Sequence, residues 1–131
     1  MKDTILQNLK KYNYNFQLEG KHKIRVKLGL NLDVMLEISE DKVSFSSQLV
    51  PWNPLTGIIE TSLQGFVKAF LFWMLAISLL YIPMASIFFD TNVLLYNIAI
   101  LIGSFSYICI VGSYFFISYE SFKTKVMLWL K

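Results

Sequence analysis

The chain has 131 residues, of which 55% are hydrophobic and 16% carry a charge, and its net charge at pH 7 is +3. This length has room for one small extramembrane module and a pair of membrane spans, and it excludes two full domains. Because the chain has one histidine and one cysteine, it cannot form an intrachain disulfide or a metal site built from several His and Cys ligands.

The first predicted element is a short amphipathic helix at residues 4–12. Ile5 and Leu9 recur at helical spacing. Thr4 and Gln7 fit a capping box, in which the two side chains satisfy free amide groups of the first turn. The apolar side of this helix is expected either to pack on the module that follows or to lie on a bilayer surface.

Apolar and polar residues alternate over residues 14–50, a pattern that predicts β-strands. A single strand over residues 22–38 would be about 56 Å long at ~3.3 Å per residue, so we expect a break near residues 29–31, where Gly and Asn tolerate positive φ. With turns at residues 20–21 and 39–42, the result is a four-stranded antiparallel meander with one apolar face. So small a sheet needs a helix, the bilayer or a second copy of the chain to cover that face.

Residues 54–66 have the pattern of an interfacial amphipathic helix. Asn53 suits the N-cap and Pro54 the first helical position, and apolar residues then recur at helical spacing. Trp52 is expected at the level of the lipid headgroups, and Gly65 at a bend into the membrane.

Two long apolar runs follow, Ala69–Phe89 with 21 residues and Val93–Ser118 with 26. About 20 apolar residues in a helix cross the ~30 Å hydrocarbon core, so each run predicts one transmembrane span, with Asp90 at the polar tip between them. Pro83 is expected to kink the first span. The predicted fold is a membrane α-helical hairpin of two transmembrane helices, preceded by a small antiparallel β-rich module with an N-terminal amphipathic helix.

Basic residues are distributed unevenly around the spans: nine of the twelve lie in residues 1–68, none at the tip, and three after the second run. Basic residues that flank spans stay on the cytoplasmic side, so we expect an inner-membrane type of protein with both termini cytoplasmic. The predicted parts are a cytoplasmic helix and β-meander module at 1–53, an interfacial helix at 54–66, a two-span hairpin at 67–118 and a cytoplasmic interfacial tail at 119–131.

The clearest polar pattern in the chain is a row of four cations, Lys21, Lys23, Arg25 and Lys27. Alternate residues of a strand share one face, so these side chains would follow one another at ~6.6 Å. A solvated sheet face explains such a row. The alternatives are contact with anionic lipid headgroups and a site for another anionic, phosphorylated ligand. Stacking aromatic residues do not interleave with the row, so a nucleic acid partner is not expected.

Small side chains fall on one helical face of the second span: Ala99, Gly103, Ser106, Cys109 and Ser113. Ala99 and Gly103 form a small-xxx-small pair, which lets another backbone approach closely. This face either packs against the first span or makes a helix–helix contact between copies, through Ala99, Gly103, Ser106 and Ser113. Its hydroxyl groups would also suit a narrow pore.

Catalytic and cofactor-binding patterns are missing from the sequence, so we expect neither an enzyme nor a cofactor. His22, the only histidine, is predicted among solvated basic residues, and the spans have no ionisable group. The sequence favours a non-enzymatic integral membrane protein that self-associates through its hairpin in the lipid bilayer. Its sharper form is a pore-forming or membrane-disrupting effector with the β-module as sensor or docking surface. The alternative is a small accessory subunit of a larger membrane protein complex.

Overall fold

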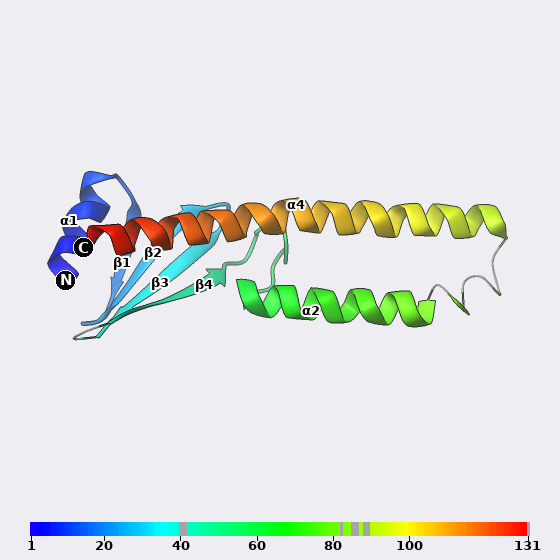
Figure 1. The fold of residues 1–131 in the computed structure, drawn as a ribbon, viewed down its shortest axis with the longest axis horizontal. Coiled ribbons are helices and arrows are strands. Elements are labelled where there is room, and N and C mark those ends of the chain that lie inside the picture. The colour runs from blue at the N-terminus through cyan, green and yellow to red at the C-terminus, as the bar shows by residue number, and fades with distance from the viewer. Residues whose placement is uncertain (40–41, 82, 85–86, 88–89, 131) are drawn as a thin grey trace.

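The computed structural model describes residues 1–39, 42–81, 83–84, 87 and 90–130. A short helix and a sheet occupy one end of the molecule, and two long helices extend side by side from it (Figure 1). In chain order the elements are α1 (Lys2–Lys11), β1 (Asn15–Glu19), β2 (Lys23–Gly29), β3 (Leu32–Ile38), β4 (Val43–Leu49), β5 (Thr61–Ser62), α2 (Leu63–Ala76), the π-helical turn η1 (Ile77–Tyr81) and α4 (Thr91–Trp129).

The sheet is an antiparallel meander in which each strand pairs with the next one along the chain, in the order β1-β2-β3-β4-β5. The four predicted strands are confirmed, and the structure adds a fifth. This strand, β5, has only two residues, and it pairs Thr61 with Leu49 and Ser62 with Gln48. Because α2 starts immediately after it, β5 fixes the first turn of that helix to the edge of the sheet.

The predicted break between β2 and β3 is confirmed, and it is a two-residue hairpin turn. Leu30 and Asn31 have φ values of 48° and 60°, the pair of positive angles that a type I′ turn requires. The register shifts between Lys27 and Gly29, so the strand carries a bulge just before the turn. The Asn31 side-chain amide also donates to the carbonyl oxygens of Pro51 (3.1 Å) and Trp52 (2.9 Å), which joins this turn to the following loop.

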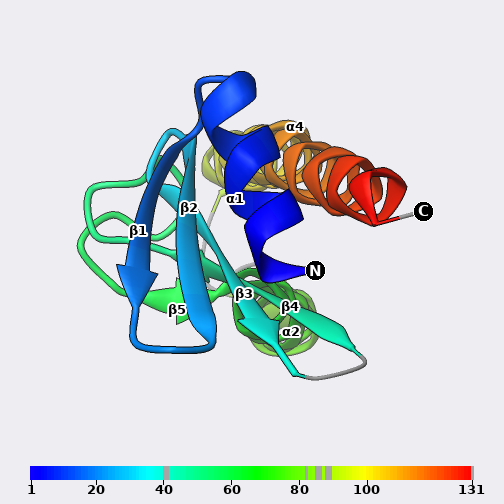
Figure 2. The same cartoon turned by 90° about the vertical axis from the view of Figure 1, so that its left-hand side faces the viewer.

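The apolar face of the sheet is covered by α1 and by the C-terminal part of α4, which Figure 2 shows packed beside each other. Ile5 and Leu9 of α1 are fully buried, as is Val126 of α4. The rings of Tyr12 and Trp129 stack at 5.6 Å between centroids where the two helices meet. Of the three covers that the sequence left open, the structure shows the first helix, and it adds the end of the last helix.

The expectation that residues 119–131 form an interfacial tail needs a correction. The segment continues α4 without interruption, and its apolar side chains Phe122 and Val126 are buried against the sheet. The sheet offers these side chains a surface they can pack against, so they contribute to a protein core. A second, smaller cluster lies further along α4, where Phe115 is buried against Leu32, Leu49 and Leu63.

The helix expected over residues 54–66 is also wrong for most of its length. Residues 54–58 form turns and an isolated bridge, and α2 begins only at Leu63. Asn53 does cap a turn, because its side-chain oxygen accepts from the amides of Leu55 (2.9 Å) and Thr56 (2.8 Å). Gly57 then takes φ +61°, a left-handed value that interrupts a helix. The N-cap of α2 is Ser62, whose hydroxyl accepts from the amide of Gly65 at 2.9 Å.

Within the described residues, two helical segments are long and apolar enough to cross a membrane, Leu63–Tyr81 with 19 residues and Thr91–Trp129 with 39. The longer one, α4, is capped at its N-terminus by Asp90, whose carboxylate accepts from the amide of Thr91 at 2.8 Å. At ~1.5 Å per residue it is about 58 Å long, well beyond the hydrocarbon core of a bilayer. The π-helical turn η1 ends at Tyr81, two positions before Pro83, and the kink expected there involves neighbouring residues outside the described part of the chain.

Candidate functional site

The structure separates the four predicted cations of the basic row. Lys23, Arg25 and Lys27 lie on β2 and share the polar face of the sheet, whereas Lys21 lies in the turn before the strand. The backbone carbonyl of Lys21 accepts a hydrogen bond from the Lys2 side chain at 2.6 Å. Three of the four cations are therefore brought together as the sequence predicted, and the fourth is placed at the end of the sheet.

Carboxylates from both neighbouring strands lie on the same polar face. The Lys23 ammonium is 3.4 Å from Glu37, and Arg25 Nε is 2.7 Å from Glu19 Oε1, an ion pair without hydrogen-bond alignment. Arg25 Nη1 is 3.7 Å from Asp33. The three cations on β2 thus face three carboxylates. This arrangement favours a solvated face of mixed charge, and binding of an anionic ligand to it stays a prediction.

Asp33 is the buried acid of this face, with only 5% of its side chain exposed. Burial raises the pKa of Asp33 above its ordinary value, because the charged form loses hydration. Arg25 and Lys27 oppose this shift and do not cancel it. Ionisation of the Asp33 carboxyl therefore costs free energy in the folded chain.

The small residues of the second predicted span do not form one uncovered face. Ala99, Gly103 and Ser106 are exposed on α4, and a Cβ added to Gly103 would meet no atom within 4 Å. Ser113 instead lines a groove between α2 and α4, together with Cys109. The Ser106 hydroxyl donates to the carbonyl of Ile102 at 2.9 Å, within its own helix. The described part of the first span thus leaves three of the four predicted contact residues free.

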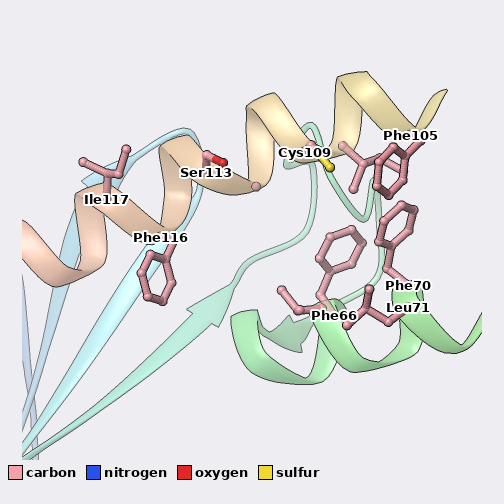
Figure 3. Close-up of a pocket in the computed structure, with 11 residues that line it drawn as sticks. Phe66, Phe70, Leu71, Phe105, Cys109, Ser113, Phe116 and Ile117 are labelled. Carbon is pink, nitrogen blue, oxygen red and sulfur yellow. The ribbon is translucent and has the colours of Figure 1, made fainter. Parts of the chain in front are cut away.

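The groove between α2 and α4 is a feature that the sequence did not reveal. The two helices meet where the rings of Phe70 and Phe105 stack at 5.9 Å between centroids, and Phe66 stacks on Phe70 at 6.1 Å. Next to this contact lies an apolar cavity of about 390 Å³, into which Phe66 and Cys109 point from opposite walls (Figure 3). The repeat of phenylalanines at 66, 70 and 105 was its only signal in the sequence.

A second cavity of about 420 Å³ continues the groove toward the sheet. It shares Val67 and Phe116 with the apolar cavity, so the two spaces adjoin. Its walls are more polar: Lys68 and Gln64 come from α2, and Glu120 comes from α4. The complete groove therefore runs from a hydrocarbon end to a charged end.

Candidate metal ligands do not gather in the part of the chain that the structure describes. Among these residues, no three His, Cys, Asp or Glu side chains are grouped so that they could hold a metal ion. His22 lies in the turn before β2 and is exposed to solvent. Comparison with known proteins adds no assignment, since no family model, no curated protein and no solved structure matches the chain. The site is thus defined by the molecule's own geometry.

Proposed function

We propose that this chain is a non-enzymatic integral membrane protein whose two long helices form a transmembrane hairpin. The support comes from two apolar helical segments, each with an apolar stretch of 18 residues that is almost wholly unburied within the chain. Exposed leucine, isoleucine and phenylalanine over such lengths need a hydrocarbon surrounding. Both termini lie at the sheet end of the molecule (Figure 1). With the distribution of basic residues, this arrangement favours both termini on the cytoplasmic side of an inner-membrane type of bilayer.

We further propose that the hairpin self-associates through the face of α4 that carries Ala99, Gly103 and Ser106. The observation that carries this proposal is the open space beside Gly103, where an added Cβ would meet no atom within 4 Å. Small residues that pack the hairpin internally would be covered by the first helix, whereas Ala99, Gly103 and Ser106 are exposed in the described part of the chain. In lipid, close backbone approach at small residues stabilises helix association.

The β-module is proposed to act as a sensor or docking surface that is coupled directly to the membrane. A single helix, α4, carries both the proposed self-association face and the residues Phe115, Phe122 and Val126 that pack on the sheet. A displacement of α4 in an assembly would therefore reach the sheet without a flexible joint. Opening of a pore or disruption of the bilayer is the sharpest form of this function, and lipid and further copies of the chain are the proposed partners.

Crosslinking in native membranes tests the self-association. We expect the wild-type chain to give dimers or larger species, and Gly103→Leu to lose them while it remains in the membrane after alkaline extraction. Ser104→Leu makes a similar increase in size on another face of the same helix, so it should assemble like wild type. If wild type is monomeric, or Gly103→Leu assembles normally, the self-association is wrong and the accessory-subunit function takes its place. Conductance measurements on vesicles then decide whether the assembly opens a pore.

A further inference from the structure

We propose that the groove between α2 and α4 binds one anionic glycerophospholipid, with an acyl chain in the apolar cavity and the phosphate at Lys68. This inference rests on the proposed insertion of the helices into a bilayer and does not depend on self-association. Each of the two cavities has a volume typical of small-molecule sites, which are ~300–1,000 Å³. Together they form one groove that has an apolar section followed by a charged section.

The apolar end of the groove has the chemistry of an acyl-chain site. Its walls combine aromatic rings from both helices with aliphatic side chains, among them Phe66, Leu71 and Ile108. Among the described residues that line it, the polar side chains are the thiol of Cys109 and the hydroxyl of Ser113. A polar headgroup would lose hydration in such a space without gaining partners, whereas a hydrocarbon chain gains contacts.

The charged end of the groove has an excess of positive charge. Glu120 is held by Lys123 at 3.4 Å, so these two charges offset each other. Lys68 lines the same cavity, and among the described residues it makes no ion pair. One cation is thus left over at this end. A phosphodiester is the lipid group that a free ammonium attracts, and additional anionic charge strengthens the attraction.

The order of the charged and apolar ends of the groove matches the order of headgroup and acyl chain in a lipid of the cytoplasmic leaflet. Lys68 immediately precedes the apolar run that starts at Ala69, so it lies where a lysine reaches the headgroup layer. Phe70 and Phe105 mark the opposite, hydrocarbon end. A lipid that enters from the side would therefore find phosphate and acyl positions in the right order.

A lipid fits this groove better than a helix from a second copy. An α-helix with its side chains is ~10–12 Å across. Phe70 and Phe105 stack at 5.9 Å between centroids, so α2 and α4 are already in contact at one end of the groove. A third helix could not lie between them without breaking that contact, whereas an acyl chain needs no such opening.

Retained lipid provides the test. The full chain is reconstituted in vesicles of equimolar phosphatidylcholine and phosphatidylglycerol, extracted with mild detergent and analysed by native mass spectrometry. We expect wild type to retain one phosphatidylglycerol. Lys68→Gln should lower that retention about fivefold, as expected for one basic residue near a lipid surface. Lys42→Gln removes the same charge from the sheet end, outside the groove, and should retain the lipid like wild type.

A second pair of variants tests the acyl end. Gly112 lines the apolar cavity, and a Cβ added there would meet no atom within 4 Å, so Gly112→Phe is chosen to place a ring in this space. This variant should lose the lipid, whereas Ile110→Phe, at an exposed position, should retain it. Three results would overturn the proposal. The first is equal retention of phosphatidylglycerol by all variants, and the second is preferential retention of phosphatidylcholine. The third is that wild type retains no lipid while Gly112→Phe loses its crosslinked dimers. Release of the chain from the membrane by alkaline extraction would instead refute membrane insertion itself.

Discussion

The Tyr107 hydroxyl donates a hydrogen bond to the backbone carbonyl of Pro54 at 3.2 Å, although 53 residues separate the two along the chain. Tyr107 lies within the apolar run of α4, and Pro54 belongs to the loop between β4 and β5. The same loop exposes Trp52, Ile58 and Ile59, whose side chains are at least 65% accessible. The hydrogen bond therefore holds an apolar loop against the proposed span, where tryptophan is favoured at the bilayer interface.

Replacing Tyr107 with Phe should release this loop. The lost hydrogen bond is worth ~0.5–1.5 kcal/mol, and the aromatic ring at position 107 would remain. We expect faster hydrogen exchange at the amides of Trp52 and Gly57, which now pair within the loop. Tyr114→Phe makes the same chemical change at an exposed ring of the same helix and should leave these amides protected. Unchanged exchange in Tyr107→Phe would mean that the loop is held by its own turns alone.

The C-terminal end of α4 should be required for the stability of the β-module. Phe122 is 2% exposed in the core that the sheet, α1 and α4 share. Phe122→Ala should lower the free energy of unfolding by ~3–5 kcal/mol, the usual cost of removing a buried aromatic ring. Thermal unfolding of the full chain in detergent, followed by circular dichroism in the β region, measures it. Leu128→Ala, at an exposed position, should change stability by less than ~0.5 kcal/mol; similar losses in both variants would contradict the packing described.

Asp33 should make the stability of the module depend on pH. Its pKa in the folded state is raised above 3.8, so the folded chain binds this proton more tightly than the unfolded chain. Stability is then highest below the ordinary pKa of an aspartate and falls as pH rises through the raised folded pKa. Asp33→Asn, which copies the protonated form, should be more stable than wild type at pH 7 and should lose this part of the slope.

Denaturant titrations at several pH values measure the effect of Asp33. Glu37→Gln provides the matched control, because Glu37 is an exposed carboxylate of the same strand that pairs with Lys23. It should change stability by less than ~0.5 kcal/mol at any of these pH values. A loss of stability in Asp33→Asn at pH 7 would show that the contact with Arg25 outweighs the burial of the charge.

The orientation of the hairpin can be tested with single cysteines in a Cys109→Ser background. Asp90 and Thr91 start α4 at the end opposite to both termini (Figure 1). Thr91→Cys should react with an impermeant thiol reagent added to intact cells, and Lys2→Cys should react only after the cells are opened. The reverse pattern would invert the topology, and equal labelling of both sites in intact cells would refute the hairpin.

The strands were predictable because a small two-layer module forces alternation on its sequence. Ile24 and Val26 alternate with Lys23 and Arg25 in a way that only a sheet with one solvated face explains. The positive φ of Asn31 was likewise visible, since Asn tolerates the left-handed region. Short-range rules therefore describe the sheet well.

Long-range packing was not predictable by the same rules. The apolar spacing after Pro54 suits a helix as well as a loop, and the Asn53 side chain closes a turn that the spacing does not reveal. The pattern of Phe122 and Val126 shows an apolar stripe, but it does not distinguish lipid from a sheet formed some 100 residues earlier. The groove beside Phe70 and Phe105 depends on how two helices approach each other, which a single sequence leaves open.

The burial of Phe122 and Val126 beneath an N-terminal sheet also imposes an order on biosynthesis. The ribosome makes the strands first, and the residues that close their core emerge only after α2 and most of α4 have been made. A nascent chain thus presents an incomplete, apolar sheet until the end of α4 has been made. The module can therefore be completed only when both helices of the hairpin are present. A chain truncated before Phe122 would expose that sheet to the cell's proteases.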